Sequence, residues 1–329
     1  MDVGIAYDLK SSFEKTQEGP IDRLEEYDEE TTVVALEKAL AILGHQPRRL
    51  RGGRALLEEV LQRPPELVFN IAEGYGSRSR EAHVPAVLEM LGIPFTHSDP
   101  LTLALALDKG MTKQVVAAAG VPTPDFAVIR TRDDLDRVAL PFPLVAKPLF
   151  EGSSIGVRLT SKVRDRAALR AEVERLLTDY AQPVLVEAFC PGMELTVGVL
   201  CREGVPTVLG VMEIAPRKVS NQDFVYSLEV KRNYLQEVEY LVPPRLPVPV
   251  IEEAGRVALA VFTALDCRDV ARVDLRLDAA GQPRFIEINP LPGVNPVTSD
   301  LCILARGCGW TYEQLVGGIV QSARHRYAL

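Results

Sequence analysis

The stretch ARVDLRLDAAGQPRFIEINPLPG, residues 271–293, sets two runs of alternating apolar and polar residues on either side of a Gly-containing turn. Such alternation predicts two β-strands whose successive side chains point to opposite faces of a sheet. If AAGQ forms the turn, Asp274 lies opposite Glu287 and Arg272 lies opposite Asn289. The sequence therefore predicts a hairpin with two carboxylates facing each other across neighbouring strands.

Two facing carboxylates repel each other, and like-charge pairs across strands destabilise a sheet by up to about 1 kcal/mol. A hard divalent cation would offset this repulsion, because Mg²⁺ binds carboxylate, carbonyl and phosphate oxygens. Asp274, Glu287 and Asn289 carry suitable oxygens. An amphipathic hairpin with its polar face in water accounts for the same pattern. From the hairpin alone, both interpretations stay open.

Upstream, AKPLFEGSSIGV offers Lys147 on a predicted strand, followed by a loop that contains Ser153 and Ser154 between glycines. Glycines allow backbone N–H groups to approach phosphate oxygens closely, and hydroxyl groups add donors. The loop lacks the GxxxxGK[ST] pattern of a P-loop. A plain connection between two strands is the alternative.

Two further stretches carry polar groups that suit a nucleotide. VLVEAFCPGMEL places Glu187 and Glu194 at the edges of an apolar slot, and LDKGMTK places Lys109 on a predicted helix. Taken singly, Glu187 is equally a surface residue at the end of a strand, and Lys109 a solvated lysine. A phosphate loop, lysines, an acidic slot and a metal-binding face in one chain together favour a nucleotide site.

The composition narrows the class of protein. The chain has 329 residues, 47% of them hydrophobic and 25% charged, which is ordinary for a globular protein. A formal charge of -8 argues against nucleic acid as a partner. Five cysteines without CxxC pairs, a start (MDVGIAYD) unlike a signal peptide, and the lack of an apolar run of about 20 residues predict a cytoplasmic protein without a membrane partner.

Strand and helix patterns alternate over residues 1–100, which predicts an N-terminal open parallel α/β domain. PLTLALALDKGMTKQVVAAAG, residues 100–120, has helical spacing and opens a second unit. We predict a central domain over residues 101–186 with the Gly/Ser loop, and a C-terminal α+β domain over residues 187–329 with the metal-binding hairpin.

In order along the chain, DK, VAKPLFEGSSIGV, VLVEAFCPGMELTV, EVK, RVDLRL and EINPLPG resemble the motifs of D-alanine:D-alanine ligases, which belong to the ATP-grasp superfamily. The resemblance runs from about residue 66 to the C-terminus. It implies a three-domain ATP-grasp fold and an ATP-dependent ligase that joins two amino acids through an acylphosphate, as in peptidoglycan synthesis. It also implies two Mg²⁺ ions, with Mn²⁺ as a substitute, and a homodimer.

The resemblance assigns roles to particular residues. The nucleotide ligands it implies are Lys109, Lys147, Ser153, Glu187, Ala188, Phe189, Cys190, Glu194 and Lys231. The metal ligands it implies are Asp274, Glu287 and Asn289, and the catalytic groups are Arg272, the backbone of Gly293 and Ser154. The substrate residues it implies are Glu73, Arg80, Thr298 and Ser299.

The chain departs from the family pattern around the amino-acid pocket. The GGxSxE stretch is missing, and Glu26 or Glu29 is a loose match for the acid that binds the amine. NIAEGYGSRSREAHVP replaces HGxxGEDG, and Arg232 stands where the family has a tyrosine. Arg80, with the nearby Arg78, would bind a further anionic group or belong to a solvated loop. The substrates therefore stay open, and a nucleotide-binding regulatory protein without turnover is the alternative function.

Overall fold

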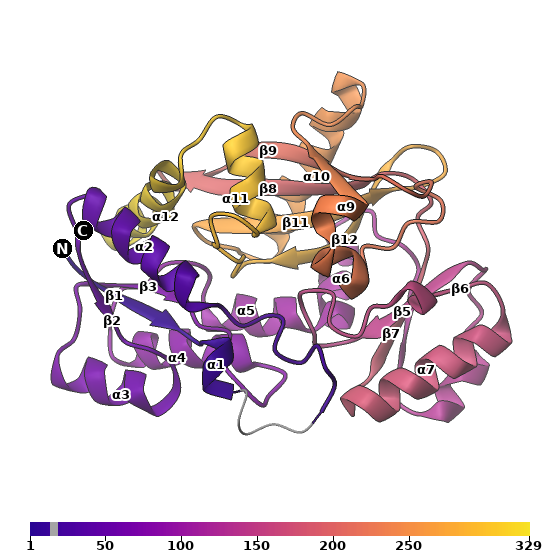
Figure 1. Cartoon of the computed structure of the whole chain (residues 1–329), viewed down its shortest axis with the longest axis horizontal. Coiled ribbons are helices and arrows are strands. Elements are labelled where there is room, and N and C mark those ends of the chain that lie inside the picture. The colour runs from indigo at the N-terminus through magenta and orange to yellow at the C-terminus, as the bar shows by residue number, and fades with distance from the viewer. Residues whose placement is uncertain (14–18) are drawn as a thin grey trace.

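The structure is a computed structural model, and it describes residues 1–13 and 19–329. It contains three β-sheets with helices packed around them (Figure 1). The N-terminal sheet lies beside the large C-terminal sheet, and the central sheet with its long helix forms the other end of the molecule. The predicted combination of α/β and α+β architecture is confirmed.

The N-terminal sheet is parallel, with strand order β2-β1-β3. Its strands are β1 (Asp2–Tyr7), β2 (Gln46–Arg49) and β3 (Leu67–Ile71). The helices are α1 (Lys10–Phe13), α2 (Glu30–Ile42), α3 (Gly53–Gln62), the 3₁₀ helix η1 (Arg80–Ala82) and α4 (His83–Met90). Strand β3 is buried along its whole length, as expected for a parallel strand covered on both faces.

The predicted helical segment over residues 100–120 is two helices, α5 (Pro100–Leu107) and α6 (Lys109–Ala118). Asp108 lies between them in an extended conformation, and its side chain accepts a hydrogen bond from the backbone N–H of Met111. A side-chain cap of this kind begins a new helix and satisfies one of its free N–H groups. The break therefore makes Lys109 the first residue of α6.

The central sheet is antiparallel, with strand order β4-β7-β5-β6. Its elements are β4 (Phe126–Ile129), η2 (Arg132–Arg137), β5 (Leu144–Pro148), η3 (Leu159–Ser161), β6 (Lys162–Val163), α7 (Arg166–Tyr180) and β7 (Val184–Ala188). Leucine and valine side chains of α7 pack on β5 and β7 in one core. The domain boundary predicted after residue 186 falls inside β7, whose pairing with β5 continues to Ala188, and the exact division stays a prediction.

The C-terminal sheet is antiparallel, with strand order β10-β9-β8-β11-β12. Its strands are β8 (Glu194–Arg202), β9 (Val205–Pro216), β10 (Val238–Leu241), β11 (Val270–Leu277) and β12 (Pro283–Asn289). Its helices are α8 (Leu228–Arg232), α9 (Tyr234–Glu237), α10 (Val248–Ala264), α11 (Asp300–Gly307) and α12 (Tyr312–Tyr327).

Two cores position this sheet. Helix α10 covers one face, where it packs on Val273 and Leu275 of β11 and on Phe285 of β12. Helix α12 packs against α2, and its apolar side chains share one core with β1 and β3 (Figure 1). The N-terminal and C-terminal domains are therefore joined by a continuous core rather than by a linker alone.

The hairpin of β11 and β12 has the predicted pairing at its functional end. Asp274 lies opposite Glu287, and Arg272 lies opposite Asn289. Nearer the turn the register differs by one residue, because a bulge between Asp274 and Leu275 leaves Ile286 of β12 without an opposite residue. The bulge compensates for a turn that closes one residue earlier than the symmetric AAGQ turn predicts.

The five cysteines are free thiols, as expected. Within the part of the chain that the structure describes, no helix is both long and apolar enough to cross a bilayer.

Candidate active site

Two cavities meet on the polar face of the β11–β12 hairpin. The larger has a volume of about 580 Å³ and the smaller about 110 Å³. The residues that line both are Lys109, Tyr226, Lys231, Arg272, Glu287 and Asp300. Molecules held in the two cavities would therefore touch along a shared, highly charged wall.

The facing carboxylates of the hairpin line these cavities, Glu287 both of them and Asp274 the smaller one. The side chain of Asp274 is 16% exposed and that of Glu287 is 22% exposed, so the interpretation of a hairpin face in open water is wrong. Arg272 donates to Asp274 at 2.9 Å and lies 3.9 Å from Asp300. Burial raises the pKa of Asp274, and the neighbouring Glu287 adds to this, although Arg272 opposes it.

Glu287 has the opposite shift. Burial alone would raise its pKa, but Lys109, Lys147 and Arg272 outweigh that effect and lower the pKa. Lys109 Nζ lies 3.7 Å from Glu287 Oε2. The carboxylate of Glu287 is therefore charged at neutral pH.

The residues of the hairpin suit a hard cation. Asp274 and Glu287 supply carboxylate oxygens, and the side-chain amide of Asn289 reaches within 3.4 Å of Asp274 Oδ2. Among residues 1–13 and 19–329 no three His, Cys, Asp or Glu side chains gather as a complete metal site. A cation such as Mg²⁺ would take its remaining ligands from water and phosphate, as Mg²⁺ does at nucleotide sites.

Lys147 and Glu187 lie side by side on β5 and β7, in the smaller cavity. Lys147 Nζ is 2.6 Å from Glu187 Oε1, and Lys113 Nζ is 2.8 Å from Glu187 Oε2. Burial alone would raise the pKa of Glu187, but the two lysines outweigh it and lower the pKa. Glu187 is 3% exposed and Lys109 is 7% exposed, so the interpretations of a surface glutamate and a solvated lysine are wrong.

Lys113 was not predicted from the sequence as a residue of the site. This residue is fully buried, and its ammonium group also donates to Thr123 Oγ1 at 2.8 Å and to the carbonyl oxygen of Phe285 at 3.2 Å. Its position four residues after Lys109 on the same helix was the available signal, because residues at that spacing share a helix face.

The rest of the smaller cavity comes from the chain that follows β7. Ala188, Phe189 and Cys190 line it, and Glu194 begins β8 at its edge. Arg276, also missed, donates to Glu194 at 3.1 Å. Burial nevertheless raises the pKa of Glu194 to about 7.

The Gly/Ser loop and α8 approach each other where the cavities meet. Ser154 and Lys231 line the smaller cavity, Ser153 and Lys231 the larger. Ser154 Oγ donates to the carbonyl oxygen of Tyr226 at 2.8 Å. The ammonium group of Lys231 lies 5.1 Å from the centre of the Tyr226 ring. The loop and α8 therefore lie in contact at the junction.

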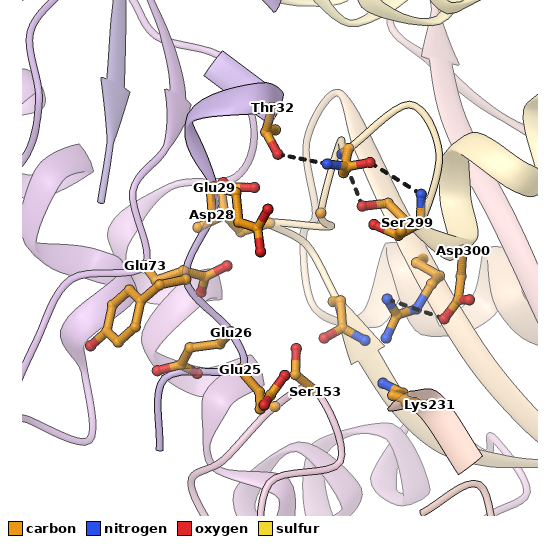
Figure 2. A pocket seen from close by; sticks show the side chains of 18 of the residues that line it. Glu25, Glu26, Asp28, Glu29, Thr32, Glu73, Ser153, Lys231, Ser299 and Asp300 are labelled. Atoms are coloured by element: carbon orange, nitrogen blue, oxygen red, sulfur yellow. Dashed lines mark hydrogen bonds and ion pairs between the residues drawn. The ribbon is translucent and has the colours of Figure 1, made fainter. Parts of the chain in front are cut away.

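One wall of the larger cavity is acidic. Figure 2 shows side chains of Glu25, Glu26, Asp28, Glu29 and Glu73 on one side, with Lys231 and Asp300 across from them. Burial and the neighbouring Glu81 raise the pKa of Glu73 well above its usual value. Burial also raises the pKa of Asp28 to about 7.

The loop after β12 forms another part of the larger cavity. Gly293, Thr298 and Ser299 line it. Ser299 Oγ accepts a hydrogen bond from the backbone N–H of Asn295 at 2.9 Å, and the Asn295 side chain donates to Thr32 Oγ1 at 3.0 Å (Figure 2). A Cβ atom at position 293 would lie 2.9 Å from Ser299 Oγ, so the close approach of this loop favours glycine.

Arg80 is placed differently from the other predicted residues. Arg80 is not among the described residues that line the two cavities. Arg80 is 6% exposed, and its guanidinium group donates to Glu26 at 2.6 Å, to Glu151 at 3.2 Å and to the carbonyl oxygen of Phe150 at 3.0 Å. Of the two arginines, only Arg78 is exposed as expected for a solvated loop. Direct contact of Arg80 with a substrate stays a prediction, and the buried position of Arg80 does not support it.

A family model described as "D-ala D-ala ligase C-terminus" matches residues 115–321. A D-alanine–D-alanine ligase from Paramagnetospirillum magneticum is 37% identical over 283 residues, which cover 83% of this chain and 85% of that protein. An uncharacterised protein, y4sG, from Sinorhizobium fredii is 37% identical over 306 residues, which cover 88% and 86%.

Among solved structures, the D-alanine–D-alanine ligase from Bacillus anthracis complexed with ATP has a TM-score of 0.72 and covers 100% of both chains. At 20% sequence identity this likeness speaks for the fold. The predicted three-domain ATP-grasp fold is thereby confirmed.

Proposed function

Since the chain belongs to the D-alanine–D-alanine ligase family and is an ATP-dependent ligase of that kind, we propose that it phosphorylates the carboxylate of one amino acid and joins it to the amine of a second. The observation that carries this proposal is the meeting of the two cavities at Lys109, Lys231, Arg272 and Glu287. A phosphoryl group can pass between two bound molecules only where their sites touch.

We assign ATP to the smaller cavity. The adenine would lie against the chain from Glu187 to Cys190, with the ribose near Glu194. Lys147 and Lys109 lead from there to the hairpin, where they offset the negative charge of the phosphates. The loop with Ser153 and Ser154 would cover the phosphates from the other side.

Two Mg²⁺ ions, or Mn²⁺ in their place, would be held by Asp274, Glu287 and Asn289. When bound there, a divalent cation would supply positive charge that screens the repulsion between two anionic reactants. Arg272 lies against Asp274 and lines both cavities, so its guanidinium group would face the reacting carboxylate.

The chain's own groups account for the chemistry. A carboxylate is a poor electrophile, and transfer of the γ-phosphoryl group to it makes an acylphosphate with phosphate as a good leaving group. Attack by the amine of the second amino acid then creates an oxyanion. Arg272 and the backbone N–H of Gly293 would stabilise this oxyanion, a contribution whose loss typically costs about 3 to 4 kcal/mol.

The larger cavity would hold the two amino acids. Glu73 and its acidic neighbours would bind an ammonium group, while Thr298 and Ser299 would bind the carboxylate of the second substrate. Both are expected to be D-alanine by family precedent. The departures around Glu73 and Arg80 make other amino acids or amines the alternative. A cytoplasmic location and a homodimer stay predictions.

The decisive experiment incubates the protein with ATP, Mg²⁺ and D- and L-amino acids, singly and pooled, and measures phosphate release and product mass. We expect phosphate release that depends on an amino acid, a dipeptide product, and loss of activity with a chelator. Glu287→Gln should lower the rate about 100-fold or more. The exposed Glu252→Gln on α10 is the control and should leave the rate unchanged. Nucleotide binding without amino-acid-dependent turnover would contradict ligation and indicate a regulatory protein.

A further inference from the structure

Residues 19–29, which precede α2 and are here named the strap, reach across the larger cavity to both loops that cover the phosphate site. They belong to the N-terminal domain in sequence. Glu25, Glu26, Asp28 and Glu29 line the cavity, whereas Asp22 points away toward the central domain. The strap is therefore a third cover beside the Gly/Ser loop and α8.

Asp22 is the anchor of the strap. Its side chain is fully buried and accepts hydrogen bonds from the backbone N–H of Gly156 at 2.8 Å and from Tyr180 Oη at 2.9 Å. Arg158 Nη1 lies 2.9 Å from the same carboxylate. Burial alone would raise the pKa of Asp22, but these three partners outweigh it and lower the pKa. The carboxylate is thus a charged, fully satisfied group between two domains.

The Gly/Ser loop needs such an anchor because its backbone is strained. Ser153 and Ser154 have φ angles of 50° and 59°, in the left-handed region that non-glycine residues rarely adopt. Gly156 has a φ of 78°, and a Cβ atom there would lie 2.3 Å from Pro148. Strained conformations persist where surrounding contacts hold them. The bond from Gly156 to Asp22 is one such contact, two residues after Ser154.

Further contacts join the strap to its neighbours. Glu25 Oε1 accepts from Arg232 of α8 at 2.5 Å. Glu26 pairs with Arg80, which in turn holds Glu151 and the Phe150 carbonyl at the start of the Gly/Ser loop. The strap therefore contacts α8 directly through Glu25. It contacts the end of the Gly/Ser loop through Asp22, and Arg80 links it to the start of that loop.

The two covering loops also bind each other. The backbone N–H of Leu228 donates to the carbonyl oxygen of Val157 at 3.1 Å, and Arg158 lies 3.8 Å from Glu229. Arg158 thus contacts α8 and Asp22 at once. Displacing Asp22 would loosen the Gly/Ser loop and, through Arg158, its contact with α8.

We propose that Asp22 is a positioning residue for ligation, holding the Gly/Ser loop and α8 closed over the site so that the activated amino acid meets the amine and not water. This inference rests on the proposed function for its chemistry, but the closure itself does not depend on which amino acids react. Asp22 is not among the described residues that line the two cavities, and it acts through Gly156 and Arg158. Exclusion of water matters because an acylphosphate hydrolyses to the free acid and phosphate, which wastes ATP.

The test is Asp22→Asn, which keeps the shape and removes the charge. Asp136→Asn, at an exposed carboxylate of η2 paired with Arg170, is the matched control. In the wild type and the control we expect about one phosphate released per peptide bond formed. In Asp22→Asn the ratio should rise at least threefold, because water competes for the acylphosphate. Simple loss of folded protein would lower both products together and leave the ratio unchanged.

A second measurement does not require turnover. Amide hydrogen exchange in peptides covering residues 150–158 and 226–232 should be faster in Asp22→Asn than in the wild type, with the α10 peptide unchanged as an internal reference. Tyr180→Phe, which removes one donor to Asp22, should give a smaller change in the same direction and serves if Asp22→Asn does not fold.

The outcomes separate the two proposals. Unchanged exchange and an unchanged ratio in both variants would overturn the role of Asp22 while leaving ligation intact. A wild type that forms no peptide bond would overturn the proposed function, and faster exchange in the variants would still support closure by the strap.

Discussion

The carboxylates of the smaller cavity and those of the acidic wall lie in one site but are neutralised differently. Glu187 lies between Lys113 and Lys147, and Glu194 contacts Arg276. On the acidic wall, no hydrogen bond or ion pair within 4 Å joins Glu73 to any side chain of residues 1–13 and 19–329. Glu25 and Glu26 of the same wall pair with Arg232 and Arg80, so among these carboxylates the contrast with Glu187 is sharpest at Glu73.

This difference indicates what each side binds. Glu187 and Glu287, each beside two lysines, have lowered pKa values and form a charged frame around lysines that can face phosphates. Burial raises the pKa of Glu194 despite its contact with Arg276. Burial beside Glu81 raises the pKa of Glu73, because the protein does not compensate the charged form of this carboxyl group. An ammonium group of a substrate would supply that compensation and favour the charged form.

The paired side is tested most severely at Lys113. Lys113→Met would leave Glu187 with one cation in a buried place, and breaking a buried ion pair costs about 3 to 5 kcal/mol. We expect the free energy of unfolding, measured by chemical denaturation, to fall by about that much. The double variant with Glu187→Gln should recover part of the loss, and Lys38→Met at an exposed position of α2 should change little. A loss below about 1 kcal/mol for Lys113→Met would contradict a buried ion pair between Lys113 and Glu187 that stabilises the fold.

Glu73, a carboxylate of the acidic wall with no ion pair among the described residues, is the next to be tested. Hydrogen bonds to charged groups contribute about 1.5 to 3 kcal/mol, so Glu73→Gln should raise the KM for the amino acid about tenfold or more. The KM for ATP should stay the same, because Glu73 lies in the larger cavity only. Glu89→Gln, at an exposed position of α4, is the matched control. Equal changes in both KM values would remove the distinction between the two sides.

The smallest expected effect concerns Asp28 and pH. Its folded-state pKa is raised to about 7, so between about pH 4 and 7 the folded protein holds a proton that the unfolded chain has lost. Stability from this group therefore falls as pH rises through that window. Asp28→Asn should be close to wild type at pH 4 and more stable by about 1 to 2 kcal/mol at pH 8, measured by chemical denaturation at each pH. A stability difference that does not change with pH would contradict the burial of an uncompensated charge at Asp28.

The sequence predicted the hairpin well because strand alternation is local. Which residues share the face of Asp274 follows from the period of two, and the structure has that face turned to the cavities. The symmetric turn was wrong by one residue, and the bulge at Ile286 restored the pairing of Asp274 with Glu287. A bulge depends on how the whole sheet twists, which no short stretch encodes.

Other features were missed because they join distant segments. Arg80 and Glu26 are 54 positions apart, and Asp22 and Gly156 are 134 apart. Neither stretch has a motif that would announce such a partner. The break at Asp108 was missed for a different reason, since apolar spacing continues through it while the capping side chain ends one helix and begins the next.

The sequence by itself determined the kind of strand, the polar face of the hairpin and the residues able to bind phosphate and metal. These depend on covalent geometry and on the chemistry of each side chain. Only the tertiary structure decided which carboxylates are neutralised, because burial and the distance to a cation set the free energy of a charge. Both of those quantities arise when segments far apart in the chain pack together.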